Sequence, residues 1–124
     1  MSVYPEITSA LLADPNADDC AAYDAAKGNE DAQIWLARLF AAKSEAATDR
    51  AFQASGALIA LVYSGLAAVH GKVEAVSLYR DCLARHRALA EYHPSSAALQ
   101  DERIARLGAA VEGKAPTDRV EVRI

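Results

Sequence analysis

The sequence has few of the residues on which disulfide-bonded and sheet-rich proteins depend. Its 124 residues include two cysteines, four prolines and one tryptophan, and aromatic residues make up only 6%. Cys20 and Cys82 are too few and too far apart in the chain for a disulfide framework. The first residues, MSVYPEITSALLADP, lack a basic region followed by an apolar run, so no secretory signal is visible. These absences predict an intracellular, cytoplasmic protein.

The charge of the chain argues against one common class of function. The formal net charge is −4, which does not suit a nucleic-acid binder held by phosphate contacts. Acidic residues gather in the first 31 residues, where seven of them stand against a single base, Lys27. Solvated helix faces and a surface that attracts a basic partner both fit this excess. No nucleic-acid partner is therefore expected.

The alanine-rich apolar content favours closely packed helices. Apolar residues make up 52% of the chain, and few of them are β-branched or aromatic. A chain of this length forms one domain around a single core. We therefore predict an all-α fold, a helical bundle of five to six helices over residues 1–113, followed by an extended C-terminal arm over residues 114–124. Trp35 stands among Ile34, Leu36 and Leu39, which favours a core position over an exposed partner anchor.

Capping residues, prolines and glycines predict where the helices begin and end. In the first half, the predicted boundaries are a helix from Pro5, a second from Asp14-Pro15 to about Lys27 before Gly28, a third capped by Asn29 or Asp31 and running through Lys43, and a new segment from Ser44. In the second half, they are a long helix from Val73 to about His93, ended by Pro94, and a last helix capped by Ser95 or Ser96 and ended by Gly113 and Pro116.

A charge-free interval runs from Ala51 to Gly71. Its length would suffice to cross a bilayer core of about 30 Å. Three glycines and several polar residues dilute it, and Arg50 and Lys72 stand at opposite ends, so no positive-inside asymmetry orients a span. We therefore predict a central core helix and no membrane span. Small residues at every fourth position form a ridge that would let another helix come close: Gly56, Ala60, Ser64 and Ala68.

The motifs of common enzyme classes are missing from the sequence. It contains no glycine-rich phosphate loop, no paired-cysteine motif and no nucleophile elbow. The best chemical candidate is the set Cys82, His86 and His93, on one side of the long helix at spacings of four and seven residues. A closed zinc site needs four ligands, and a cysteine in an apolar seam is ordinarily a small buried thiol. We predict no catalytic residue, no metal and no cofactor, with a metal site at these three residues as an alternative.

Two fragments resemble units of Sel-like and tetratricopeptide repeats. The first is DAAKGNEDAQIWLARLF, from Asp24 to Phe40, in which a Gly-Asn turn follows a run of small residues. Leu36, Ala37 and Phe40 then occupy the family's Leu-small-x-x-aromatic positions. The second is GKVEAVSLYRDCL, from Gly71 to Leu83, which is similar to the turn and second helix of such a unit. The resemblance implies a helical-hairpin scaffold that binds a protein segment without catalysis, although no period near 34 residues runs through the chain.

The last seven residues, DRVEVRI, alternate strictly between charged and apolar side chains, which is typical of a strand. An isolated strand leaves its backbone groups without partners. A disordered tail is one interpretation. The other is β-augmentation, in which the arm adds to a sheet of a partner protein. The predicted partner-binding residues are Arg119, Val120, Val122, Arg123 and Ile124.

These observations predict a non-enzymatic structural or assembly protein that acts through protein–protein contacts. It would work as a homo-oligomer or as a small adaptor subunit of a larger particle, such as a bacteriophage neck, and would then be a virion component. The C-terminal arm would add to a sheet of the partner. One alternative is a repeat-like helical peptide-binding module. A second is a small metal-binding protein or enzyme that uses Cys82, His86 and His93.

Overall fold

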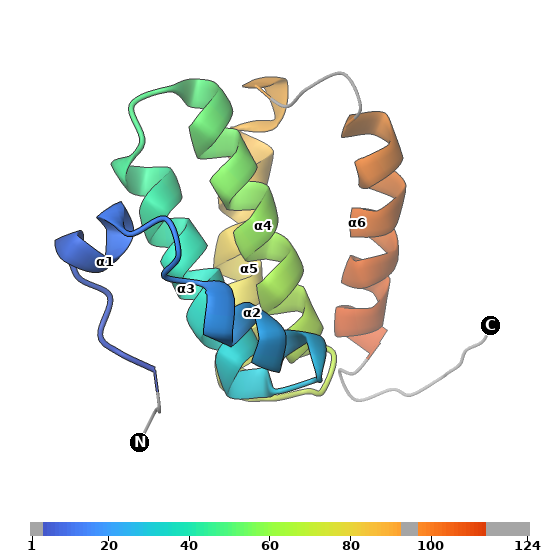
Figure 1. The fold of residues 1–124 in the computed structure, drawn as a ribbon. Helices are drawn as coiled ribbons and strands as arrows, with labels where there is room; N and C mark the ends of the chain where they lie inside the picture. Colours follow the sequence, from blue (N-terminus) through green and yellow to red (C-terminus); the bar gives the residue numbers. More distant parts are fainter. Residues whose placement is uncertain (1–3, 93–96, 114–124) are drawn as a thin grey trace.

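The all-α class predicted from the sequence is confirmed. The computed structural model describes residues 4–92 and 97–113, and within these ranges it contains helices and no strand (Figure 1). The helices are, in chain order, α1 (Ser9–Ala13), α2 (Asp19–Ala26), α3 (Glu30–Ala46), α4 (Arg50–Ala68), α5 (Val73–Ala88), the short 3-10 helix η1 (Ala90–Tyr92) and α6 (Ala97–Gly113).

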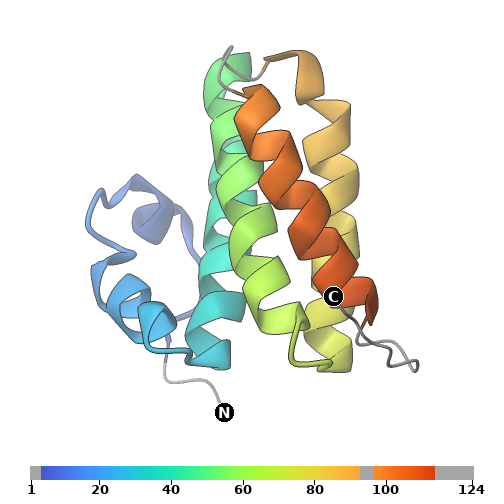
Figure 2. The ribbon, with the colours of Figure 1, turned by 90° about the vertical axis from the view of Figure 1, so that its right-hand side faces the viewer.

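The central helix of the bundle is α4, which packs against α3, α5 and α6 (Figures 1 and 2). The predicted ridge of small residues lies in these interfaces, since its four members are all buried: Gly56, Ala60, Ser64 and Ala68. A Cβ added to Gly56 would lie only 3.0 Å from the Cβ of Ser44 on α3. Small side chains on α4 therefore set how closely the neighbouring helices approach.

By length and composition alone, α4 could also cross a membrane. Half of its apolar stretch is buried inside the bundle, however, and the core helix of a bundle has the same composition. Packing against α3, α5 and α6 thus accounts for the buried half of this stretch. The absence of a membrane span stays a prediction from the sequence.

Trp35 holds the N-terminal segment against α3. The side chain of Trp35 is 7% exposed, its Nε1–H donates a hydrogen bond to the carbonyl oxygen of Pro5 at 2.8 Å, and its ring stacks on Tyr4 with centroids 5.4 Å apart. Pro5 lies outside any helix, so the predicted helix start at Pro5 is wrong. Instead, α1 begins after Thr8, whose hydroxyl accepts a hydrogen bond from the backbone N–H of Leu11.

The start of α2 also differs from the prediction, whereas the start of α3 agrees with it. Asp14 does not cap α2, because its side-chain oxygen accepts a hydrogen bond from the backbone N–H of Asn16 at 2.9 Å and so stabilises a turn. The helix itself begins at Asp19. Asn29 is the cap of α3, since its side-chain oxygen accepts a hydrogen bond from the backbone N–H of Ala32 at 3.0 Å.

Ser44 lies inside α3 and does not begin a new segment as predicted. Its hydroxyl donates a hydrogen bond to the carbonyl oxygen of Gln53 at 2.6 Å and accepts one from Nε of Arg85 at 3.0 Å. These bonds join α3 to α4 and α5, and they keep the last turn of α3 in place. The next helix, α4, begins after its cap Asp49, whose carboxylate accepts a hydrogen bond from the backbone N–H of Ala51.

The long fifth helix ends earlier than predicted. The last residue of α5 is Ala88, and the N–H of Leu89 is shared between the carbonyl oxygens of Arg85 and His86, at 3.1 and 3.2 Å. The Leu89 side chain is buried in one cluster with two alanines of α4, Ala54 and Ala57. This packing turns the chain into η1, so the predicted continuous helix from Val73 to His93 is wrong.

Two junctions of the fold have the same geometry 43 residues apart. Gly28 precedes α3 and Gly71 precedes α5, both with a left-handed backbone, at φ of +92° and +84°. Each donates its N–H to the carbonyl oxygen three residues earlier, at 2.9 Å, and each is followed by the N-cap of the next helix. Buried positions match at the same offset: Ala21 with Ser64, Ala25 with Ala68, Ala32 with Ala75, Leu36 with Tyr79, and Leu39 with Cys82. The chain thus contains two similar helix–turn–helix units.

This correspondence continues into α6. Val111 is buried and follows Ala68 by 43 residues, and Gly108 follows Gly65 by the same offset. Both glycines lie where a side chain of another helix comes close: a Cβ at Gly108 would be 3.0 Å from the hydroxyl oxygen of Tyr79, and one at Gly65 would meet the side chain of Leu107. A period of 43 residues lies within the range of about 40–47 found in some helical repeats.

Candidate partner-binding site

The residues predicted to bind a partner cannot be located in the fold. Arg119, Val120, Val122, Arg123 and Ile124 lie outside the described residues, as does the rest of the predicted arm over residues 114–124. Whether this arm pairs with a sheet stays a prediction from its alternating pattern.

The three residues of the alternative metal site separate into two groups. Cys82 and His86 are both buried on α5, whereas His93 lies outside the described residues. Among the side chains that the structure describes, no three from His, Cys, Asp and Glu gather closely enough to hold a metal ion. Burial raises the pKa of the Cys82 thiol, which keeps it protonated, whereas a nucleophile or metal ligand must be a thiolate. Cys82 therefore fits the packing role that a buried thiol ordinarily has.

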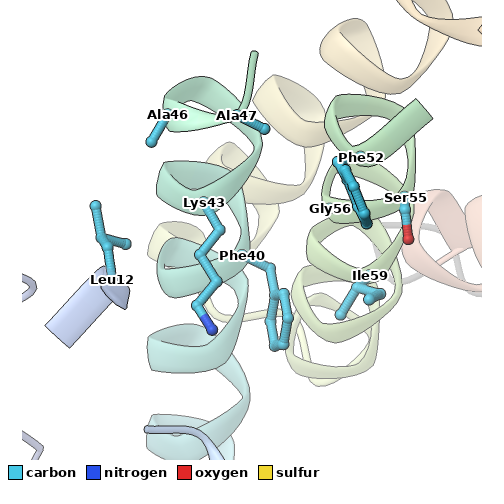
Figure 3. Close-up of a pocket in the computed structure, with 9 residues that line it drawn as sticks. All are labelled: Leu12, Phe40, Lys43, Ala46, Ala47, Phe52, Ser55, Gly56 and Ile59. Carbon is cyan, nitrogen blue, oxygen red and sulfur yellow. The ribbon is translucent and has the colours of Figure 1, made fainter. Parts of the chain in front are cut away.

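A pocket between α3 and α4 was not predicted from the sequence (Figure 3). This α3–α4 pocket has a volume of about 370 Å³. Side chains from α3, α4 and their connection form most of it, and one residue of α1 lies at its edge. The lining residues are Leu12, Phe40, Lys43, Ala46, Ala47, Phe52, Ser55, Gly56 and Ile59.

Two side chains from facing helices form the apolar wall of the pocket. Phe40 extends from α3 toward α4, and Ile59 extends from α4 toward Phe40 (Figure 3). The ring of Phe40 also stacks with the ring of Tyr63 of α4, with centroids 6.4 Å apart. The two helices come close together at Gly56, because an added Cβ there would be 3.1 Å from the carbonyl oxygen of Phe40. A rigid contact between α3 and α4 thus supports the wall.

Phe52 is the most unusual residue of the pocket. Its side chain is 70% exposed, although it stands in the first turns of an apolar helix. Burial of a large apolar side chain is worth about 1.5–3 kcal/mol, which the ring of Phe52 does not gain within this fold. Phe52 therefore extends the apolar lining of the pocket out to the surface.

The pocket carries one cation and no acid. Lys43 is its only charged lining residue, and the ammonium group lies 5.3 Å from the centroid of the Phe40 ring. The lining contains no His, Cys, Asp or Glu. It offers apolar contact, one hydroxyl from Ser55 and one positive charge, a combination suited to binding an apolar side chain beside a carboxylate.

A periodic signal in the sequence could have located this surface. Phe52, Ile59 and Leu66 recur every seven residues within the charge-free interval, with Ser55 and Val62 between them. Periodicity alone predicts an apolar face but does not say which neighbour covers it. The surface was missed because the whole interval was assigned to the core.

The comparisons with known proteins found no similar protein. No protein-family model matches the chain, and neither curated proteins nor solved structures gave a match.

Proposed function

We propose that this protein is a non-enzymatic scaffold of helix–turn–helix units that binds a segment of another protein at the α3–α4 pocket. The observation that carries the proposal is the exposed ring of Phe52, which stands beside an apolar hollow of about 370 Å³. Aromatic anchors next to apolar pockets are the usual centres of protein interfaces.

The 43-residue correspondence supports this proposal. Its two glycine turns lie inside the two fragments that resemble Sel-like and tetratricopeptide repeats, Asp24–Phe40 and Gly71–Leu83. Proteins built from stacked repeats present extended surfaces to their partners, and each unit contacts mainly its neighbours. A role as a peptide-binding module, without catalysis, is consistent with such a construction.

An assembly role is the second candidate, and the alternating pattern of residues 118–124 favours it. The protein would then be a homo-oligomer or an adaptor subunit of a larger particle, such as a bacteriophage neck. Deleting residues 119–124 should abolish association and leave the helical circular dichroism unchanged. Normal assembly of the shortened chain would contradict this role of the arm.

The leading proposal can be tested by photo-crosslinking in the native cells. A photoreactive amino acid at Ser55, which is exposed and lines the pocket, should give a discrete adduct with another protein. The same amino acid at Ala84, which is exposed on α5 outside the pocket, is the matched control. Equal crosslinking from both positions, or none from Ser55, would contradict binding at the pocket.

A further inference from the structure

An exposed apolar face of α4 continues beyond the pocket. Phe52, Ser55, Ile59, Val62 and Leu66 follow one another at spacings of three and four residues, so they share one side of the helix. Val62 and Leu66 are 38% and 39% exposed, in addition to the exposed ring of Phe52. Ser55 is also exposed, whereas Ile59 is half-buried in the wall of the pocket. These five residues, called the α4 stripe below, therefore form a face of α4 that the other described helices cover only in part.

The spacing of the α4 stripe matches a helical partner. Phe52, Ile59 and Leu66 recur every seven residues with Ser55 and Val62 between them, as in the seam of a coiled coil. A helix laid along such a seam inserts side chains between all of these positions. An extended peptide has a period of two residues and would meet only some of them.

The pocket and the stripe then form one continuous surface. A large apolar side chain of the partner helix would enter the hollow lined by Phe40 and Ile59 and pack against Phe52. The following turns of the partner would pass over Val62 and Leu66. Anchors at spacings of three, four and seven residues are typical of a helix bound in a groove.

The pocket end of this surface carries one cation. Lys43 is the one charged residue that lines the pocket. Arg50, the one charged residue of α4, is instead directed toward η1, where its guanidinium lies 5.4 Å from the centroid of the Tyr92 ring. Charges that flank an apolar seam select the partner, so acidic residues on the bound helix would be favoured and basic residues disfavoured.

A second copy of this chain fits the α4 stripe less well. The sequence of α4 contains no Asp or Glu, so an α4–α4 pair would bring no carboxylate of the facing helix to Lys43. The charge pattern therefore favours a different partner.

We propose that the α4 stripe and the α3–α4 pocket bind one amphipathic α-helix of a partner protein, with an apolar seam of seven-residue period and acidic residues beside that seam. The inference rests on the proposed function and adds the conformation and charge of the bound segment.

The experiment uses synthetic peptides of about three heptads, with covalent bridges between side chains so that each peptide is helical before it binds. One peptide has leucine along the seam and glutamate beside it, a second has lysine in place of glutamate, and a third is a scrambled form of the first. Binding to the full chain is measured by fluorescence anisotropy. The glutamate peptide should bind more tightly than the lysine peptide, and the scrambled peptide should not bind.

Two variants locate the binding surface. Phe52→Ser should weaken the glutamate peptide at least about tenfold, the loss expected for an interface anchor. Val73→Ser is the matched control, because Val73 is 83% exposed at the start of α5, outside the stripe, and its loss should leave the affinity unchanged. Circular dichroism of both variants checks that the fold is intact. Equal effects of the two substitutions, or no effect of Phe52→Ser, would overturn the inference.

The other possible occupants give different results. Self-association of the wild-type chain that Phe52→Ser abolishes would assign the stripe to a second copy, and binding to phosphatidylcholine vesicles without peptide binding would assign it to a lipid surface. Either result contradicts the partner helix. Failure of the peptides together with a discrete adduct from Ser55 would reject this inference and leave the proposed function standing. Absence of that adduct would reject the proposed function itself.

Discussion

Gly28 and Gly71 end their turns with the same left-handed backbone, 43 residues apart, and each places an N-cap residue directly before the next helix. A Cβ added at either glycine would have no neighbouring atom within 4 Å, so a side chain would fit. Glycine is therefore required at these two positions by the left-handed backbone, which other residues adopt only at a cost. This equivalence is the simplest sign that two similar units make up most of the described fold.

Replacing either glycine by alanine should destabilise the protein. A left-handed backbone costs an alanine about 1–2 kcal/mol, so Gly28→Ala and Gly71→Ala should each lower the free energy of unfolding by about that amount. Gly113→Ala is the control, because Gly113 has an ordinary φ and open space around it, and it should change stability by less than about 0.5 kcal/mol. Urea unfolding followed by circular dichroism measures all three. A loss from Gly113→Ala as large as the other two would contradict the conformational explanation.

The contact between α4 and α6 depends on Gly65. A Cβ at Gly65 would lie 2.7 Å from Cγ of Leu107, so Gly65→Ala should force α6 outward and cost about 1–3 kcal/mol. Removing the obstructing side chain tests the cause. If the clash is responsible, Gly65→Ala combined with Leu107→Ala should be less destabilising than the sum of the two single substitutions in urea unfolding. Strict additivity would show that the two residues do not meet.

The attachment of the N-terminal segment should weaken at high pH. The Tyr4 hydroxyl donates a hydrogen bond to the Asp24 carboxylate at 2.6 Å, and this bond, with burial and the negative charge of Asp24, raises the pKa of Tyr4 to about 12. Because the folded pKa lies above the ordinary value of 10.0, the protonated hydroxyl is the form that stabilises the fold. Its contribution is complete below pH 10 and is lost as the pH rises toward 12.

Trp35 fluorescence can follow this loss, because the Tyr4 ring stacks on the indole. The wild-type signal should change between about pH 10 and 12. In Tyr4→Phe, which keeps the ring and lacks the hydroxyl, the change over this range should be absent. An identical alkaline change in both proteins would assign it to other groups.

The two cysteines should react at different rates. Cys20 is exposed on α2, whereas Cys82 is 5% exposed and burial raises the pKa of its thiol. A thiol-specific disulfide reagent should therefore modify one cysteine quickly and the other slowly. Cys20→Ser should remove the fast phase alone, and urea should accelerate the slow phase. A single fast phase for both thiols in the native protein would contradict the burial of Cys82.

The sequence predicted the features that depend on local chemistry. Asn29 caps α3 because a short side chain can reach the backbone N–H of Ala32, and that property is visible in the sequence. The small-residue ridge through Gly56 was also predicted, because the four-residue spacing of its members can be seen in the sequence whichever helix packs against it.

The features that depend on distant residues were missed. Pro5 was predicted to begin a helix, but its carbonyl oxygen accepts a hydrogen bond from Trp35, thirty residues later. Leu89 was predicted to continue a helix, but its burial with Ala54 and Ala57 turns the chain aside. The α3–α4 pocket escaped prediction for the same reason, since only the arrangement of the helices leaves Phe52 uncovered.

The most direct measurement of the central claim is the effect of reversing the charge at Lys43. Affinities of the glutamate and lysine peptides would be measured for the wild type, Lys43→Gln and Lys43→Glu. An exposed ion pair contributes about 0.2–1 kcal/mol, so Lys43→Glu should weaken the glutamate peptide and strengthen the lysine peptide, each by up to about fivefold, with Lys43→Gln between them. The same ratio of the two affinities in all three proteins would contradict the account, because the pocket would then not be where an acidic partner helix binds.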